Sequence, residues 1–244
     1  MKIIIGRKPV LEAINSGDEA DQVYISYGLK GGIIDAIRIA AKKRGIKYSQ
    51  VPADKFKKIT SNPNAQGVAL VKSEYKFFTL DEILNFSKSK TFPLLLILDS
   101  IQDTHNVGAI IRTAECSGVD GIIITKHNSA PINETVVKTS AGAVSLVKIC
   151  QVTNLANVLK RLKEEGFWII GSALTDESKN YTEMDYKIPL ALILGNEEKG
   201  IRKLTIDNCD MLIKIPMQGK IQSLNVSVSA GIILFEILRQ RGLK

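Results

Sequence analysis

The feature that most constrains the fold is a series of short apolar runs separated by helix-like segments. Leu94–Leu98 is continuously apolar, which is typical of a strand buried on both faces of a parallel sheet. The further elements expected after it are strands at Gly121–Ile124, Leu146–Cys150, Phe167–Ile170 and Leu190–Leu194, and a helix over Thr153–Glu165. This alternation predicts an α/β fold, a parallel sheet with helices on both faces. Ligands of such sheets bind beyond the carboxyl ends of the strands.

The first third of the chain has its own pattern of short elements. Strands are expected at Gln22–Ser26, Ile46–Ser49 and Val68–Val71, and helices near Val10–Ile14, over Ile33–Arg44 and from Asp54 to Ile59. They predict a small α/β unit. The composition then turns polar over residues 73–91, although Leu80–Phe86 can form one helix. We therefore expect a first domain over residues 1–72, a linker over 73–91 and a second domain over 92–244.

The positive charge of the chain is concentrated in that first domain. Of a formal net charge of +8, residues 1–72 carry +7, with 13 Lys and Arg against 6 Asp and Glu. Such asymmetry favours a surface for a polyanion, of which nucleic acid is the usual example. A basic face that serves only solubility explains the charge equally well.

Other features of the composition exclude several classes of protein. No apolar run approaches the length of a membrane span, and the N-terminus has no signal-peptide pattern, so we expect a cytoplasmic protein. Cys116, Cys150 and Cys209 lie far apart and are expected to be buried reduced thiols. With only two histidines in the chain, a structural zinc site is not expected, and we predict no metal.

Three polar loops follow predicted strands. In the first, Asp99–Thr113, Asn106 is expected to cap a helix that ends near Cys116, and Arg112 suits a surface ion pair. The second, Gly195–Ile201, lacks the Gly-Lys-Ser/Thr of a phosphate-binding P-loop, and the chain has no GxGxxG. In the third, Ile215–Gly231, Ser223–Ser229 alternates like a strand, but the apolar Ile232–Leu238 predicts a largely buried C-terminal helix.

Together the three loops resemble the motifs of the SpoU/TrmH branch of the SPOUT RNA methyltransferases. The first contains the NxGxxxRT signature as Asn106, Gly108, Arg112 and Thr113, and the third matches IPM…SLNVSVSAGI. The second matches the glycine–glutamate loop, except that Glu198 stands where the family usually has glycine. The resemblance covers about residues 92–241. Residues 6–13, GRKPVLEA, are also similar to the opening of the RlmB-like subfamily.

The resemblance implies a ribose 2′-O-methyltransferase that uses S-adenosylmethionine. It further implies a deep trefoil knot in the second domain and a homodimer whose active site draws on both chains. The first domain would resemble a small ribosomal-protein fold that binds RNA. The subfamily implies a guanosine of 23S rRNA as the substrate.

The resemblance also implies roles for single residues. Arg112 and Asn106 would face the ribose and phosphate, with Glu197, Ser223 and Asn225 nearby as the remaining catalytic residues. Gly195, Ile215 and Leu224 would bind the cofactor through their backbone. Because arginine rarely loses its proton, a positive Arg112 that stabilises the developing alkoxide is physically easier than a basic one.

Three alternatives remain open from the sequence. The first is a tRNA 2′-O-methyltransferase with the same chemistry. The second is a ribosome-associated RNA-binding protein without activity, which Glu198 keeps open because glycine often serves a conformation that other residues resist. The third, a nucleotide-dependent hydrolase, is disfavoured because the chain lacks its motifs.

Overall fold

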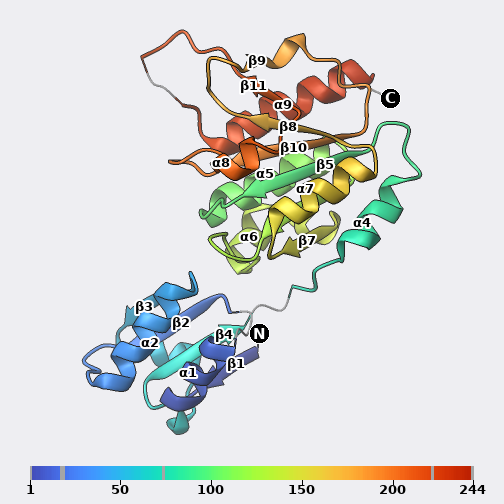
Figure 1. The fold of residues 1–244 in the computed structure, drawn as a ribbon. Helices are drawn as coiled ribbons and strands as arrows, with labels where there is room; N and C mark the ends of the chain where they lie inside the picture. The colour runs from blue at the N-terminus through green and yellow to red at the C-terminus, as the bar shows by residue number, and fades with distance from the viewer. Residues whose placement is uncertain (1, 17–19, 73–74, 221–222, 243–244) are drawn as a thin grey trace. The chain divides into compact units, whose positions relative to one another are not determined.

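The computed structural model describes residues 2–16, 20–72, 75–220 and 223–242 of the chain. Contacts divide the chain into two compact units. The first comprises residues 1–76 with Pro131–Asn133, and the second comprises Phe77–Ala130 with Glu134–Lys244. Each unit has its own sheet and core (Figure 1).

The first unit is a four-stranded mixed sheet covered on both faces. Among the described residues its elements are β1 (Lys2–Ile5), α1 (Arg7–Ser16), β2 (Gln22–Ser26), α2 (Gly32–Lys43), β3 (Lys47–Val51), α3 (Ala53–Ile59), η1 (Pro63–Ala65) and β4 (Val68–Lys72). The strand order is β1-β4-β2-β3, with β4 antiparallel to both of its neighbours and β2 parallel to β3. The small α/β unit expected from the sequence is confirmed.

Alternation along the strands builds the core of the first unit. Val23 and Ile25 of β2 point to one face, where they pack with α1 and α2 through fully buried residues such as Ile14 and Ile37. Tyr24 points to the other face, toward the cluster of α3 and η1 that contains Phe56. The sheet is therefore buried on both faces by helices from different parts of the unit.

The second unit contains the parallel sheet predicted from the apolar runs. The seven strands among the described residues are β5 (Leu94–Asp99), β6 (Gly121–Thr125), β7 (Ile149–Val152), β8 (Trp168–Ser172), β9 (Lys179–Asn180), β10 (Leu190–Gly195) and β11 (Met211–Lys214), in the order β7-β6-β5-β10-β8-β11-β9. The helices are α4 (Leu80–Ser87), α5 (Thr104–Cys116), α6 (Glu134–Thr139), α7 (Leu155–Glu164), α8 (Lys203–Ile206) and α9 (Val226–Arg241), with 3-10 turns η2 (Ala143–Ser145) and η3 (Tyr181–Glu183).

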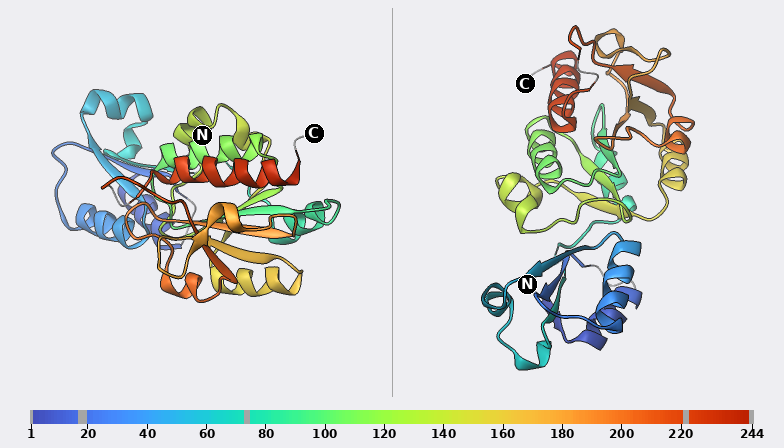
Figure 2. Two further views of the ribbon diagram at one scale, coloured as in Figure 1. Left: turned by 90° about the horizontal axis from the view of Figure 1, so that it is seen from above. Right: turned by 90° about the vertical axis from the view of Figure 1, so that its left-hand side faces the viewer.

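Helices cover both faces of this sheet. α5 and α9 lie side by side on one face, whereas α7 and α8 lie on the other (Figure 2). Strand β5, in the interior of the sheet, is buried on both faces. Leu95 and Ile97 join the core beneath α4 and α7, and Leu96 is buried on the opposite side. The strand expected at Leu146–Cys150 begins three residues later, at Ile149, because Leu146 is exposed after η2.

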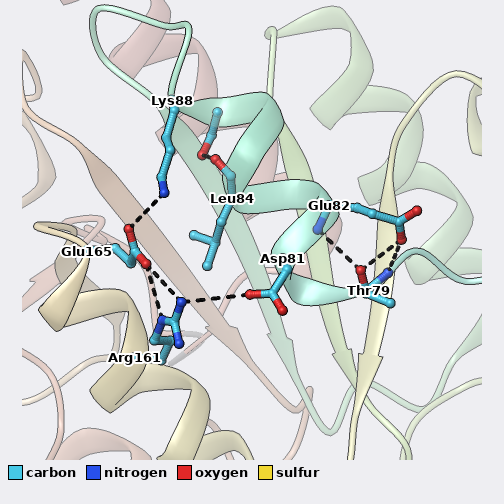
Figure 3. Close-up of polar contacts among 8 residues, drawn as sticks. Thr79, Asp81, Glu82, Leu84, Lys88, Arg161 and Glu165 are labelled. Carbon is cyan, nitrogen blue, oxygen red and sulfur yellow. Dashed lines mark hydrogen bonds and ion pairs between the residues drawn. The ribbon is translucent and has the colours of Figure 1, made fainter.

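The segment expected to be a linker, residues 73–91, contains a helix of the second unit, α4. Ile83 and Leu84 of α4 are buried in its core, and a Cβ on Gly121 would lie 2.4 Å from Ile83. Thr79 begins the helix with a capping box to Glu82 (Figure 3). Lys88 lies 3.5 Å from Glu165 at the end of the helix. The helix that the sequence allowed at Leu80–Phe86 is therefore confirmed, and it packs into the core of the second unit.

The C-terminal helix α9 contradicts the strand-like alternation of Ser223–Ser229. Asn225 caps the helix by accepting a hydrogen bond from the Ser227 backbone at 2.8 Å, so the alternating residues begin a helix. Ala230 and Ile233 are buried, but Phe235 is 49% exposed, so only one face of the helix is covered by this chain. At the other end Arg241 donates hydrogen bonds to the carbonyls of Phe92, Tyr186 and Ile188.

In the part of the chain that the structure describes, no helix combines the length and apolar character needed to cross a membrane.

Candidate active site

The three polar loops leave the same edge of the second sheet. In the parallel register Gly195, the last residue of β10, pairs with Asp99, the last of β5. On the other side of β10, Leu194 pairs with Ser172 at the end of β8, which also pairs with Ile213 of β11. The loops after these strands therefore begin side by side. This is the edge at which parallel sheets bind their ligands.

Asn106 does not cap α5, as the sequence suggested. Asp103 is the cap, and its carboxylate accepts hydrogen bonds from the backbone of His105 at 2.6 Å and of Asn106 at 3.0 Å. The helix therefore begins earlier than expected, and Asn106 lies in its first turn. Its side chain is available for contacts with other loops.

Asn106 joins all three loops. Its side-chain nitrogen donates a hydrogen bond to Glu197 Oε1 at 3.0 Å, and its side-chain oxygen accepts one from Asn225 at 3.0 Å. The Asn225 oxygen in turn accepts from the backbone and hydroxyl of Ser227. Three of the predicted catalytic residues thus form one hydrogen-bonded chain. Among the described residues, the second N–H of Asn106 and that of Asn225 have no acceptor, so each can donate to a ligand.

Asn196 extends this chain and was not singled out from the sequence. Its side-chain nitrogen donates to the carbonyl of Ser100 at 2.9 Å and to Glu197 Oε2 at 3.2 Å. Its side-chain oxygen accepts from the backbones of Glu198 and Lys199, both at 3.1 Å. An asparagine in the turn that follows a predicted strand is typical, and this is the signal that would have identified it.

The second loop depends on its two glycines and tolerates Glu198. A Cβ on Gly195 would lie 2.3 Å from the backbone of Gly200, which has a left-handed φ of +66°. Asn196 and Gly200 close the turn with a pair of backbone hydrogen bonds, each of 2.9 Å. Glu198 is not among the residues with positive φ, so the backbone conformation at this position does not require glycine.

An ion pair between a buried carboxylate and a half-exposed arginine connects the second loop to the first. Asp99 is fully buried, and its Oδ1 lies 2.7 Å from Nε of Arg202, while its Oδ2 accepts from the backbone of Arg202 at 3.2 Å. Ser100 follows with a left-handed φ of +64°, a conformation that is uncommon outside glycine. Because the Asp99 carboxylate is buried, loss of Arg202 would leave it without its ion-pair partner, so this contact helps to hold the two loops together.

Arg112 lies outside this hydrogen-bonded chain. It is exposed on α5, and none of the described residues forms a hydrogen bond or an ion pair with its guanidinium. The surface ion pair that the sequence also allowed is therefore absent from the part of the chain that the structure describes. The guanidinium is a permanent cation that the protein leaves available for an anionic or electron-rich ligand.

A cavity of about 130 Å³ lies at the ends of β8 and β11. Its lining residues are Ser172, Ala173, Leu174, Lys214, Ile215, Met217, Ser223, Leu224 and Ser229. Two of the predicted cofactor-binding residues, Ile215 and Leu224, are thus brought together. Gly195 does not line the cavity, although it ends the strand next to β8. Ser223, predicted to be catalytic, lies in the cavity wall.

The thiols differ in their surroundings. Burial raises the pKa of both Cys150 and Cys209 to about 11, so both are protonated at neutral pH. Cys116 is exposed, which contradicts the expectation that all three are buried.

Family models match both units of the chain. A model of the SpoU rRNA Methylase family matches residues 93–235, and a model for RNA 2′-O ribose methyltransferase substrate binding matches residues 3–78. A Staphylococcus haemolyticus protein assigned to the TrmH family of tRNA/rRNA methyltransferases is 39% identical over 240 residues, which cover 98% of this chain and 96% of the relative.

Solved structures share the fold. An rRNA methyltransferase from Sinorhizobium meliloti, solved with bound S-adenosylmethionine, has a TM-score of 0.63 at 24% identity and covers 99% of this chain and 88% of its own. The TrmH/SpoU tRNA modifying enzyme of A. aeolicus has a TM-score of 0.58 at 36% identity, over 66% of this chain and 82% of its own. The chain belongs to the SpoU/TrmH family of RNA methyltransferases, and its first unit is a substrate-binding domain of that family.

Proposed function

We propose that the protein transfers a methyl group from S-adenosylmethionine to a ribose 2′-hydroxyl of RNA. The observation that carries the proposal is the hydrogen-bonded chain of Asn225, Asn106 and Glu197, which gathers the three family loops at the edge that also holds the cavity. Family membership supports the reaction class.

The cavity has the chemistry that an adenosine group requires. Apolar side chains such as Leu174, Met217 and Leu224 offer a surface for the base, while Ser172 and Ser223 offer hydroxyls for polar edges. We therefore propose that Ile215 and Leu224, with Gly195 on the adjacent strand, hold the cofactor. When bound, S-adenosylmethionine supplies an electrophilic methyl group.

The residues of the site would act on the nucleophile. A ribose hydroxyl is weakly nucleophilic at neutral pH, so it must be held in line and its developing negative charge stabilised. We assign the second N–H donors of Asn106 and Asn225 to orienting the ribose. We assign Arg112 to electrostatic stabilisation of the alkoxide and of the neighbouring phosphate. Glu197 accepts hydrogen bonds at both oxygens, from Asn106 and Asn196, and so keeps these amides in place.

The proposed substrate is a guanosine of 23S rRNA, with tRNA as the second candidate. The resemblance of residues 6–13 to the RlmB-like subfamily favours rRNA. The A. aeolicus relative is a tRNA modifying enzyme, which favours the alternative. Mapping of ribose methylation in a deletion strain distinguishes them, because the lost methyl group lies either in 23S rRNA or in a tRNA.

The non-catalytic alternative is tested by cofactor binding. Calorimetry with the folded full-length protein should detect binding of S-adenosylmethionine. If the protein binds RNA but not the cofactor, in the presence or absence of RNA, it is an RNA-binding protein and the enzymatic proposal fails.

The knot and the homodimer remain proposals as well. The exposed apolar face of α9 supports a dimer, since Val228 and Phe235 are seven residues apart on one face of the helix and each is 49% exposed. Sedimentation equilibrium of the full-length protein and of Phe235→Glu tests this proposal. We expect a dimer for the first and a monomer for the second.

A further inference from the structure

The first unit contains a second, larger cavity. It has a volume of about 580 Å³ and lies where β1 ends and α1 begins, opposite the turn around η1. Its lining residues are Ile5, Gly6, Arg7, Lys8, Pro9, Ile33, Asn64 and Gln66. The volume falls within the range of pockets that bind small molecules or single nucleotides, about 300–1,000 Å³.

The walls of this cavity are held by specific backbone features. Gly6 has a left-handed φ of +94°, its N–H donates to the Val68 carbonyl at 3.1 Å, and a Cβ there would lie 3.3 Å from the Asn64 carbonyl. Arg7 Nε donates to the Gln66 carbonyl at 3.4 Å, which links the two walls. The cavity is therefore a built feature of the unit.

The lining combines three kinds of chemistry. Arg7 and Lys8 supply two positive charges, and no carboxylate lies among the lining residues that the structure describes. Pro9 and Ile33 supply apolar surface, and the amides of Asn64 and Gln66 supply both donors and acceptors. These three kinds of lining match the parts of a nucleotide. The positive charges suit a phosphate, the apolar surface suits the face of a base, and the amides suit the hydrogen-bonding edge of a base.

We propose that this cavity binds one unpaired nucleotide of the substrate RNA. Its phosphate contacts Arg7 and Lys8, and its base lies against Pro9 and Ile33. The inference rests on the proposed function, in which RNA is the substrate, and it assigns a place of contact within the substrate-binding domain. An unpaired nucleotide fits because bases stacked in an RNA duplex cannot enter a pocket, whereas those of loops and bulges can.

Fluorescence anisotropy with the full-length protein tests the proposal. The probes are a labelled single-stranded oligoribonucleotide of about twelve nucleotides and an RNA duplex of the same length. The pocket variant is Arg7→Ala/Lys8→Ala. The matched control is Lys42→Ala/Lys43→Ala, which removes two exposed positive charges from the end of α2 in the same unit. Asn64→Ala tests the pocket without any change of charge.

The pocket variant should weaken binding of the single strand by about tenfold or more, since it loses charge-assisted contacts to phosphate. The control should weaken it by about threefold or less at the same salt concentration. Asn64→Ala should weaken binding of the single strand and leave binding of the duplex unchanged.

Two results overturn the proposal. Equal losses in the two double variants would mean that only overall charge matters, and equal losses for single strand and duplex would mean that only the RNA backbone is contacted. Thermal unfolding of each variant, followed by circular dichroism, serves as the check on folding of the first unit. Since the anisotropy assay needs no methyl transfer, failure of the pocket and failure of the methyltransferase proposal are separate outcomes.

Discussion

The side chain of Asn106 donates a hydrogen bond to Glu197 at 3.0 Å, although the two residues are 91 positions apart in the chain. The bond connects the first turn of α5 with the turn after β10. Asn196, directly before Glu197, donates to the carbonyl of Ser100 and thus holds the same two loops together from the other side. We interpret this pair of contacts as the framework of the active site.

Asn196 is the first point at which this framework can be tested. Asn196→Ala removes the contacts to Ser100 and Glu197, so Glu197 and Asn106 lose their fixed positions. We expect kcat for methyl transfer to fall by between about ten- and a hundredfold, since small displacements of reacting groups are costly, with KM for S-adenosylmethionine unchanged.

The matched control for Asn196 is Asn208→Ala. Asn208 is half-buried, and the side-chain hydrogen bond that the structure shows for it goes to the carbonyl of Leu204 at 2.8 Å, outside the hydrogen-bonded chain of the three loops. A kcat in Asn196→Ala equal to that of the control would exclude a positioning role.

The second loop gives a prediction about glycine. Gly195→Ala should abolish cofactor binding, because the added Cβ would meet the backbone of Gly200 at 2.3 Å. Gly200→Ala should cost only the left-handed conformation, about 1–2 kcal/mol, because nothing lies within 4 Å of its Cβ position. Glu198→Gly should leave cofactor affinity unchanged. Calorimetry on the three variants checks this order, and a large gain in affinity for Glu198→Gly would show that the family glycine matters at position 198.

Because α4 packs in the core of the second unit, we expect a substitution in its buried face to lower the stability of that unit. Ile83→Ala should lower the free energy of unfolding of the second unit by about 2–5 kcal/mol, because Ile83 is fully buried. Leu146→Ala is the control, since Leu146 is 72% exposed, and it should change stability by less than about 0.5 kcal/mol. Urea unfolding measures both. Equal effects would mean that α4 is a linker after all.

From the burial of the Asp21 carboxyl we predict that the stability of the first unit depends on pH. Burial raises the pKa of its carboxyl from 3.8 to about 6, and Oδ1 has no hydrogen-bond partner among the described residues. The folded state therefore holds the proton more tightly than the unfolded state does. Its stabilising contribution is fully present below pH 3.8 and is lost as pH rises through about 6.

Asp21→Asn removes this ionisation. At pH 7 we expect the variant to be more stable than the wild type by about 1 kcal/mol, after allowance for solvent screening of a partly exposed group. The difference should vanish at pH 4. Thermal unfolding at both pH values measures it, and a variant that is less stable than the wild type at pH 7 would refute the assignment.

The sequence predicted those parts of the fold that depend on continuous apolar runs. Leu94–Leu98 and Leu190–Leu194 both form central strands, because residues buried on both faces leave a clear signal. The sequence was a weaker guide where a short polar–apolar alternation is compatible with either a strand or a helix. Ser223–Ser229 alternates like a strand, yet Asn225 caps a helix there because α9 buries one face against α5.

The site was predictable as a set of loops but not as a geometry. Asn106, Glu197 and Asn225 were named from motifs, whereas their mutual hydrogen bonds depend on the strand order that brings β5 and β10 together. From the sequence Asn106 was expected to cap the helix, and only the structure shows that Asp103 is the cap. The role of Arg112 remains a prediction, since it has no partner among the described residues.

Arg112 has the strongest predicted effect on the reaction. Arg112→Ala should reduce methyl transfer by about 10²–10³-fold, as expected for loss of a group that stabilises negative charge in the transition state. Arg112→Lys should recover little, because the planar two-pronged donor is lost. Cofactor affinity and thermal stability should stay unchanged, because the side chain is exposed. Normal turnover in the alanine variant would remove Arg112 from the mechanism.

The most direct test of the account is transfer of a labelled methyl group. Purified protein is incubated with methyl-labelled S-adenosylmethionine and ribosomal RNA or tRNA from a strain that lacks the gene. The RNA is then digested to nucleosides. The account predicts that the label is recovered in a 2′-O-methylated nucleoside and that Arg112→Ala removes it. Label on a base, or none in either RNA from a protein that binds the cofactor, would contradict the account.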